Sequence, residues 1–217
     1  MTETIQQVRL YDLGNTLLKM GHADYVFGRK PQLRASYELG DIEANLQYEL
    51  LLQEGLQQGK VRLFVGEGVE RKLAADAERG IDNAVFSTCL TGAVDAALEQ
   101  TELRPYVQRV FSTFDYNAPE ADIAKKSAAT KTAGGFRAVR IALGNRIISY
   151  ADDKIAELVR AREGLGQYVS LYRIGEDSPS DTPAVTVMRS IADIPTTHGG
   201  LQVRRRPMPT QRIRQGV

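Results

Sequence analysis

The sequence predicts an α/β protein in which short apolar strands alternate with helices. Three apolar segments each run directly into polar residues: residues 8–11 into Asp12, residues 83–86 into Ser87, and residues 146–151 into Asp152. Segments with apolar residues at helical spacing lie between them. Open α/β sheets bind ligands at the carboxyl ends of their strands. We therefore expect a site where these polar residues follow their strands.

The composition indicates one domain with a modest insertion and a sizeable core. The chain has 217 residues, of which 42% are hydrophobic, and no stretch approaches the length of a membrane span. No signal peptide is expected from the first residues, and the single Cys89 excludes an internal disulfide, so we expect a cytoplasmic protein. The formal net charge of +1 argues against nucleic-acid binding by the domain as a whole.

Helices are expected after the first strand. Residues 31–39 and 41–58 both show helical patterns, and Asp41 is a candidate N-cap for the second. In that helix Ile42, Leu46 and Leu50 recur at helical spacing, so this face could pack on the core or on another subunit. The oligomeric state stays open.

The remaining elements follow in alternation. The expected helices are residues 66–79, 92–101, 128–143 and 154–163, and the expected later strands are residues 109–112, 168–174 and 184–188. Asp152 is a candidate N-cap of the helix at 154–163. A closing turn is expected at residues 190–194.

The residues Asp12-Leu13-Gly14-Asn15-Thr16 resemble the first motif of the haloacid dehalogenase (HAD) superfamily, Asp-x-Asp-Gly-Thr. The resemblance implies a doubly wound, mainly parallel α/β sheet with a small helical cap inserted after the first strand. The core would comprise residues 1–19 and 61–195, and the cap residues 20–60. A helical hairpin that only packs on the core is the alternative to a cap.

The resemblance also implies roles for this motif. Asp12 would be the carboxylate nucleophile that forms an aspartyl-phosphate. Asp12 and the backbone carbonyl of Gly14 would bind Mg²⁺, which neutralises charge and orients the phosphoryl group. Asn15 and Thr16 would bind the phosphate, or Thr16 would brace the loop.

Gly14 departs from the family pattern, because phosphatases of the family have a second Asp at this position. That Asp protonates the leaving group and then activates water, a role worth roughly 10²–10⁴ in rate. Glycine cannot perform it. Another group substitutes, the leaving group needs little help, or the protein is a weak or inactive member.

The next two motifs are less specific. Ser87, with Thr88 as the alternative, matches the hydroxyl of the second motif, which hydrogen-bonds the phosphoryl group. Lys125, with Lys126 as the alternative, matches the lysine of the third motif, whose ammonium offsets negative charge. A solvated lysine pair is the other interpretation of this segment.

The fourth motif resembles an apolar strand that ends in acids. Asp153 takes the metal-binding position, Glu157 the later acidic position, and Asp152 the variable one. Two strands that end in carboxylates at one edge of a sheet suit a Mg²⁺ site.

The C-terminal segment, residues 196–217, is rich in Arg and is expected to be disordered. It could contact nucleic acid or an acidic partner, and a solvated tail is the alternative.

The leading functional hypothesis is a Mg²⁺-dependent HAD-type phosphatase acting on a phosphorylated small molecule, with no membrane partner. The alternatives are a catalytically impaired HAD-like binding or regulatory protein, and a dehalogenase or phosphonatase that cleaves C–X or C–P bonds.

Overall fold

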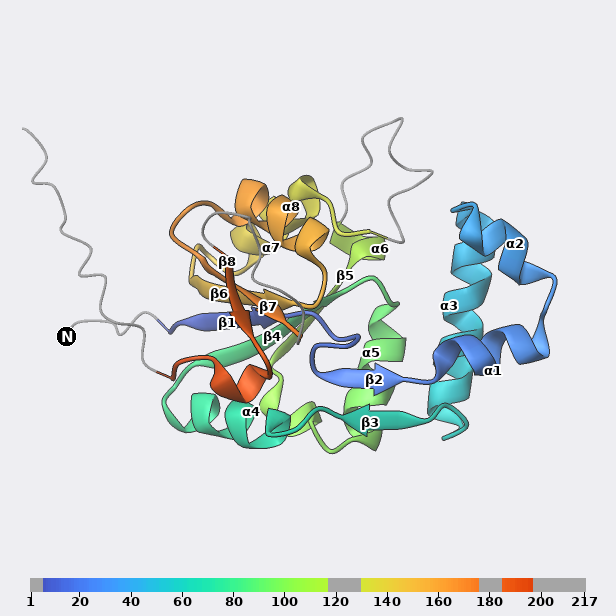
Figure 1. The fold of residues 1–217 in the computed structure, drawn as a ribbon, viewed down its shortest axis with the longest axis horizontal. Coiled ribbons are helices and arrows are strands. Elements are labelled where there is room, and N and C mark those ends of the chain that lie inside the picture. The colour runs from blue at the N-terminus through green and yellow to red at the C-terminus, as the bar shows by residue number, and fades with distance from the viewer. Residues whose placement is uncertain (1–5, 117–129, 176–184, 197–217) are drawn as a thin grey trace, which may run out of the picture.

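A six-stranded parallel sheet lies between two layers of helices in the computed structural model (Figure 1). The structure describes residues 6–116, 130–175 and 185–196. The strand order is β5-β4-β1-β6-β7-β8, and every neighbouring pair is parallel. The strands of this sheet are β1 (Val8–Tyr11), β4 (Asp82–Ser87), β5 (Arg109–Ser112), β6 (Ile147–Asp152), β7 (Ser170–Ile174) and β8 (Val185–Met188). The predicted doubly wound sheet is confirmed.

The central strand β1 marks the point where the chain reverses its direction across the sheet. From β1 the chain proceeds to β4 and β5 on one side, and then to β6, β7 and β8 on the other. Connections that diverge in this way leave a crevice at the carboxyl end of the central strand. The residues that follow β1 therefore lie where a ligand site is expected.

Helices cover both faces of the sheet, so both faces of its central strands are buried. The helices of one layer are α4 (Val69–Glu78) and α5 (Thr91–Gln100), and those of the other are α7 (Ala133–Ala142) and α8 (Ile155–Leu165). Successive strand residues point to opposite faces. Leu10 accordingly joins the core cluster under α7 and α8, whereas Tyr11 joins the cluster under α4 and α5.

A helical insertion follows β1 at one end of the molecule (Figure 1). The strands β2 (Leu18–Met20) and β3 (Leu63–Val65) pair antiparallel at its base, and between them lie α1 (His22–Arg29), α2 (Leu33–Glu38) and α3 (Ile42–Gln57). The helices α2 and α3 were expected, but α1 was not. It has no side-chain cap at its N-terminus, so the usual start signal is missing.

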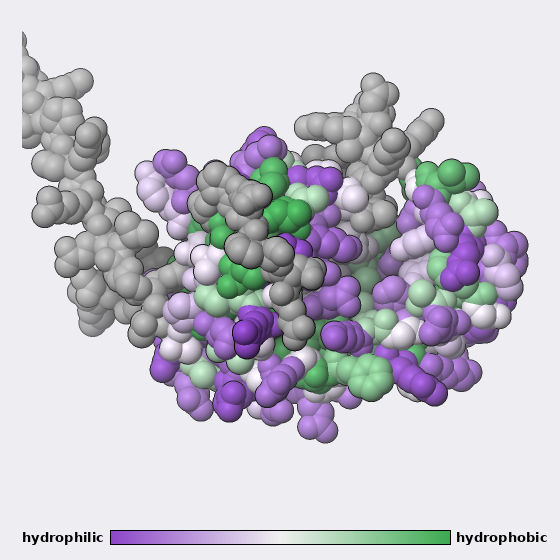
Figure 2. All heavy atoms as spheres, viewed as in Figure 1, coloured by the Kyte–Doolittle hydropathy of each residue, from purple (hydrophilic) through white to green (hydrophobic). Residues whose placement is uncertain are grey.

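Helix α3 packs on the core through a different face from the expected one. Its buried side chains include Tyr48, Leu52 and Leu56, which share one core cluster with α5. The expected apolar face is exposed, by 37% at Ile42, 41% at Leu46 and 52% at Leu50. Figure 2 shows apolar surface over α2 and the start of α3. The option that this face packs on the core was therefore wrong.

Two helix starts also differ from expectation. Helix α7 begins at Ala133, because the Thr132 side chain accepts a hydrogen bond from the Gly135 backbone N–H and caps it. Helix α8 has Lys154 at its N-cap, and Asp152 instead accepts a hydrogen bond from the Lys154 backbone N–H. The N-cap role predicted for Asp152 was wrong.

Three short helices complete the described fold: η1 (Arg104–Tyr106), α6 (Thr113–Tyr116) and η2 (Ile191–Asp193). The last begins with a capping box formed by Ser190 and Asp193, at the expected closing turn. Within residues 6–116, 130–175 and 185–196, no helix is long and apolar enough to cross a membrane. The Arg-rich residues 197–217 lie outside the described residues.

Candidate active site

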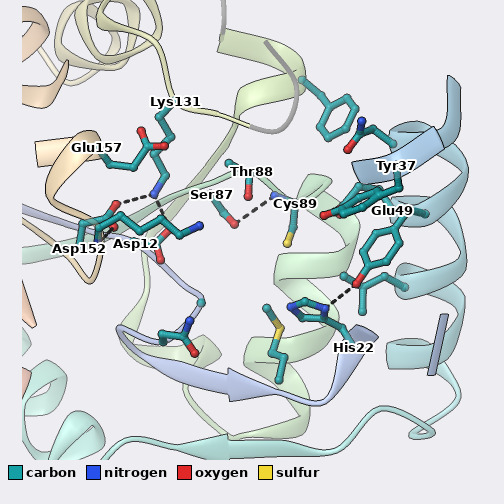
Figure 3. A pocket seen from close by; sticks show the side chains of 18 residues that line it. Asp12, His22, Tyr37, Glu49, Ser87, Thr88, Cys89, Lys131, Asp152 and Glu157 are labelled. Carbon is teal, nitrogen blue, oxygen red and sulfur yellow. Dashed lines mark hydrogen bonds and ion pairs between the residues drawn. The ribbon is translucent and has the colours of Figure 1, made fainter. Parts of the chain in front are cut away.

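A cavity of about 170 Å³ opens at the carboxyl ends of β1, β4 and β6, opposite helices α1 and α3 (Figure 3). Asp12, Gly14, Ser87, Asp152 and Glu157 all line it. The structure therefore brings together predicted residues from three of the four motifs.

The register of the sheet places Asp12 beside Asp152. Tyr11 pairs with Ala151 across β1 and β6, and the Asp12 backbone N–H donates to the Ala151 carbonyl at 2.8 Å. Asp12 directly follows β1, and Asp152, which follows Ala151, is the last residue of β6. The two carboxylates consequently meet at one edge of the sheet, as expected for neighbouring parallel strands.

Lys131 connects these two acids. Its ammonium contacts a carboxylate oxygen of Asp12, and it donates to Asp152 Oδ2 at 2.8 Å and to the Tyr150 hydroxyl at 2.9 Å. The Tyr150 hydroxyl in turn hydrogen-bonds the Asp152 carboxylate. All four groups are buried. One buried cation is thus shared by two buried carboxylates.

The contacts of Lys131 with both carboxylates affect the protonation of all three groups. Burial disfavours the charged form of Lys131, but the two carboxylates outweigh it and raise the pKa of the ammonium. Burial also opposes ionisation of Asp152, but Lys131 outweighs it and lowers the pKa of that carboxyl. Burial, together with the charge of Asp152, raises the pKa of Asp12 to about 7 despite Lys131. The site has more acid than its lysine can neutralise.

Asp153 lies next to this cluster. Oxygen atoms of Asp12, Asp152 and Asp153 lie within 4.8 Å of one another, which suits a metal ion. Asn15, in a left-handed backbone conformation with φ of 57°, donates from Nδ2 to Asp153 Oδ2 at 3.2 Å. The other oxygen, Asp153 Oδ1, is buried and lacks a hydrogen-bond partner in the described part of the chain.

The donor set fits a hard cation such as Mg²⁺, which prefers oxygen ligands. One buried oxygen of Asp153 has no hydrogen-bond partner among the described residues, whereas both oxygens of Asp152 are hydrogen-bonded, to Lys131, Tyr150 and the Lys154 backbone. Glu157 Oε2 and Thr16 Oγ1 are likewise buried without a partner among the described residues. Such unpaired buried atoms are costly unless a ligand satisfies them.

The second strand end contributes hydroxyls. Ser87 ends β4, and its Oγ accepts a hydrogen bond from the Cys89 backbone N–H at 3.2 Å. Ser87 and Thr88 both line the cavity. Figure 3 shows Ser87 between Asp12 and the helices of the insertion.

No protein-family model and no curated protein matches the sequence at a significant level. Solved structures do match. YfnB from Bacillus subtilis, bound to magnesium, is 11% identical with a TM-score of 0.58, covering 87% of this chain and 96% of that one. A HAD phosphatase from Thermococcus onnurineus is 16% identical with a TM-score of 0.53, covering 85% and 94%. An L-2-haloacid dehalogenase from Xanthobacter autotrophicus is 12% identical with a TM-score of 0.53, covering 81% and 79%.

This chain has the fold of the HAD-superfamily hydrolases. The resemblance of its first motif and the similarity of its structure therefore agree. At these identities the similar structures show the fold alone, and they include both dehalogenases and phosphatases.

Lys131, which lines this cavity, was not identified from the sequence. Lys125 and Lys126, the candidates for the third HAD motif, lie outside the described residues. The lysine that reaches Asp12 in the structure is Lys131. A local signal was present, since Lys131 directly precedes Thr132, the N-cap of α7.

The helices of the insertion contribute the other side of the cavity. His22 Nδ1 and the Tyr48 hydroxyl lie 2.5 Å apart, and Tyr37 and Glu49 line the same side. Burial and the nearby Lys154 ammonium lower the pKa of His22, which favours its neutral form. Sequence reasoning assigned none of these residues to the site.

Proposed function

We propose that the protein is a HAD-type hydrolase that removes phosphate from a small phosphorylated molecule through an aspartyl-phosphate on Asp12. The main support is the position of Asp12. It follows the central strand, contacts Lys131, and shares one cavity with Ser87. A carboxylate nucleophile, a cation and a hydroxyl donor are the groups that this transfer needs.

In the proposed first step, a carboxylate oxygen of Asp12 attacks phosphorus and the bond between phosphorus and the leaving oxygen breaks. The leaving oxygen keeps the electron pair of that bond and takes a proton from solvent. Water then attacks the aspartyl-phosphate, loses a proton to solvent, releases inorganic phosphate and regenerates the carboxylate. Lys131 stabilises the negative charge that accumulates, and the Ser87 and Thr16 hydroxyls donate to the phosphoryl oxygens. Tyr150 positions Lys131 through its hydroxyl.

Mg²⁺ is the proposed cofactor. Without it, the acids around Lys131 would repel a phosphate dianion. Asp12, Asp153 and the Gly14 carbonyl would hold the ion, with Glu157 near by and Asp152 as a weaker ligand. When bound, it would supply charge neutralisation and orientation of the phosphoryl group.

Because residue 14 is a glycine, no side chain at this position can protonate the leaving group as the second Asp of the motif would. The structure has room for such an Asp, because the nearest heavy atom to a Cβ added at Gly14, apart from its chain neighbours, would be Met20 Cε at 3.9 Å. We therefore expect Gly14→Asp to fold and to raise the rate of phosphate release, by up to roughly 10²–10⁴. Gly14→Asn, of equal size but without acid or base function, is the matched control.

The test is phosphate release from a panel of phosphorylated metabolites with Mg²⁺. We expect turnover by the native protein that is lost in Asp12→Asn, while circular dichroism shows that this variant stays folded. Equal turnover in Asp12→Asn would refute the nucleophile. If the native protein is silent and only Gly14→Asp is active, the site binds phosphate but is catalytically impaired. A chloro- or bromo-acid turned over in place of the phosphate esters would refute the phosphatase.

A further inference from the structure

The side of the cavity that faces the leaving group belongs to the insertion. We call it the insertion wall, and it consists of His22, Tyr37, Asn45, Tyr48, Glu49 and Leu52. Figure 3 shows Tyr37 and Glu49 on one side of the cavity and Asp12, Lys131 and Asp152 on the other. A group attached to a phosphate bound at Asp12 would extend toward this wall.

Glu49 is a buried acid without a cation. It is 7% exposed, and its carboxylate accepts a hydrogen bond from the Leu90 backbone N–H at 3.2 Å. Among the described residues no Lys or Arg forms an ion pair with it. Burial raises the pKa of Glu49 to about 7, although Leu90 and the nearby Cys89 oppose the rise. A carboxylate has about four acceptor sites, so capacity for a ligand remains.

The other cations of the cavity do not compensate Glu49. Lys131 pairs with Asp12 and Asp152, and Lys154 lies near Asp153 and His22. The insertion wall contains no Lys or Arg, and burial and Lys154 favour a neutral His22. A second anionic group on the substrate would thus face an acid, with no cation from the described residues on this wall to receive it.

Two aromatic side chains lie beside this acid. The rings of Tyr37 and Tyr48 are 4.3 Å apart between centroids and tilted by 31°. Burial, together with nearby Glu49, raises the pKa of both phenols, which keeps them neutral. Aromatic rings attract cations, most strongly away from water. An acid with neutral aromatic rings is a suitable environment for an ammonium group.

The distance between this wall and the phosphate site is short. Cys89 lies close enough to Glu49 to affect its pKa, and its backbone N–H donates to the Oγ of Ser87 at 3.2 Å. Cys89 is thus near both the acid and the proposed phosphate-binding hydroxyl. A cavity of about 170 Å³ is also small, since one of about 150 Å³ encloses benzene. The leaving group should therefore contain only a few heavy atoms.

We propose that the substrate is the phosphate monoester of a short amino alcohol, whose ammonium group is bound by Glu49 beside Tyr37 and Tyr48. This inference rests on the proposed function, in which Asp12 and Ser87 hold the phosphate. The ammonium supplies the cation that Glu49 lacks among the described residues, and a leaving group of this size fits the cavity.

Three esters of nearly equal size test the proposal: ethanolamine phosphate, 2-hydroxyethyl phosphate and 2-phosphoglycolate. Their far ends are an ammonium, a hydroxyl and a carboxylate. We expect kcat/KM to fall in that order, with the ammonium ester preferred over the hydroxyl ester by about 10- to 100-fold, as for one charge-assisted hydrogen bond. A hydroxyl or carboxylate ester that is preferred would overturn the proposal.

Glu49→Gln is the decisive variant, because its amide oxygen can still accept from the Leu90 N–H. We expect it to lower kcat/KM for the ammonium ester by about 10-fold or more and to raise it for the carboxylate ester. Glu54→Gln, which removes an exposed acid from the same helix, is the matched control and should retain the native order. If the only role of Glu49 were to stabilise the contact between α3 and α5, the variant would lower the free energy of unfolding and leave the order of kcat/KM for the three esters unchanged. That outcome would refute the proposal.

Binding to Asp12→Asn separates this inference from the proposed function. Calorimetry with the same three esters in Mg²⁺ should reproduce the order in affinity. If no ester is hydrolysed by the native protein but this order of binding is found, phosphatase activity is refuted and the ammonium site is supported. If phosphate esters are hydrolysed without preference for the ammonium ester, the function is supported and the ammonium site is refuted.

Discussion

Lys131 is the residue on which the charge balance of the site depends. It is buried, and its ammonium contacts the buried carboxylates of Asp12 and Asp152. Burying such a pair costs desolvation free energy that the attraction only partly offsets. Removing the cation alone leaves the cost without the attraction.

We therefore expect Lys131→Met to lower the free energy of unfolding by about 3–5 kcal/mol at pH 8 without metal ions. Urea denaturation in a chelator measures this. Lys19→Met removes an exposed lysine and should change stability by less than about 0.5 kcal/mol. An equally small effect of Lys131→Met would show that the lysine does not stabilise the two acids.

Site residues could be predicted from the sequence where the neighbouring residues alone indicate their position. Asp12, Ser87 and Asp152 each end or follow an apolar strand, and the register of parallel strands brings such ends together. Lys131 was missed because its place directly before the N-cap of α7 does not tell which carboxylates its ammonium reaches. Glu49 was missed for a similar reason, since its role depends on how α3 packs on α5.

At the scale of elements, α7 and α8 pack unusually closely at Gly164. A Cβ added there would lie 2.4 Å from Phe136 Cβ and 2.5 Å from the Ala133 carbonyl oxygen. Phe136 in turn packs edge-on against Tyr150, at 5.0 Å between ring centroids. Glycine at this position lets α7 approach α8, with Phe136 of α7 against Tyr150 of β6.

We expect Gly164→Ala to lower the free energy of unfolding by about 1–3 kcal/mol, because the helices must separate. Alanine favours a helix over glycine by about 1 kcal/mol, so its intrinsic effect has the opposite sign. Gly28→Ala in α1 isolates that intrinsic effect, since an added Cβ there meets nothing within 4 Å, and it should stabilise the protein. Thermal denaturation of both variants checks the two signs, and stabilisation by Gly164→Ala would refute the close packing.

The same scale explains which elements could be predicted. The strands of the six-stranded sheet and the helices α4, α5 and α8 follow apolar periodicity and were predicted within a few residues, whereas β2 and β3 were not predicted as strands. The interpretation that the Leu46 and Leu50 face of α3 packs on the core was wrong, because apolar residues occur on two sides of this helix. Periodicity does not say which side meets the core. Its buried side includes Tyr48 and Leu52, and its exposed side Leu46 and Leu50.

At the scale of the whole molecule, charge is balanced overall but not locally. The chain has a formal net charge of +1. Its cavity nevertheless contains the acids Asp12, Glu49, Asp152 and Glu157 and the two lysines Lys131 and Lys154. Ligands of positive charge, a metal ion at one end and an ammonium group at the other, would correct this imbalance. In their absence, the excess acid should make stability depend on pH.

The contribution of Glu49 to that dependence has a definite sign. Burial raises its pKa from 4.5 to about 7, so between these values the folded protein binds a proton that the unfolded chain releases. The free energy of unfolding should therefore fall as pH rises from about 5 to 8, by at most roughly 3 kcal/mol from this group. In Glu49→Gln that loss disappears, so the variant should gain stability relative to the native protein as pH rises. Urea denaturation in a chelator at pH 5, 6, 7 and 8 measures the difference, with Glu54→Gln as the control. A difference that stays constant across this range would show that Glu49 ionises in the folded protein as it does in the unfolded chain.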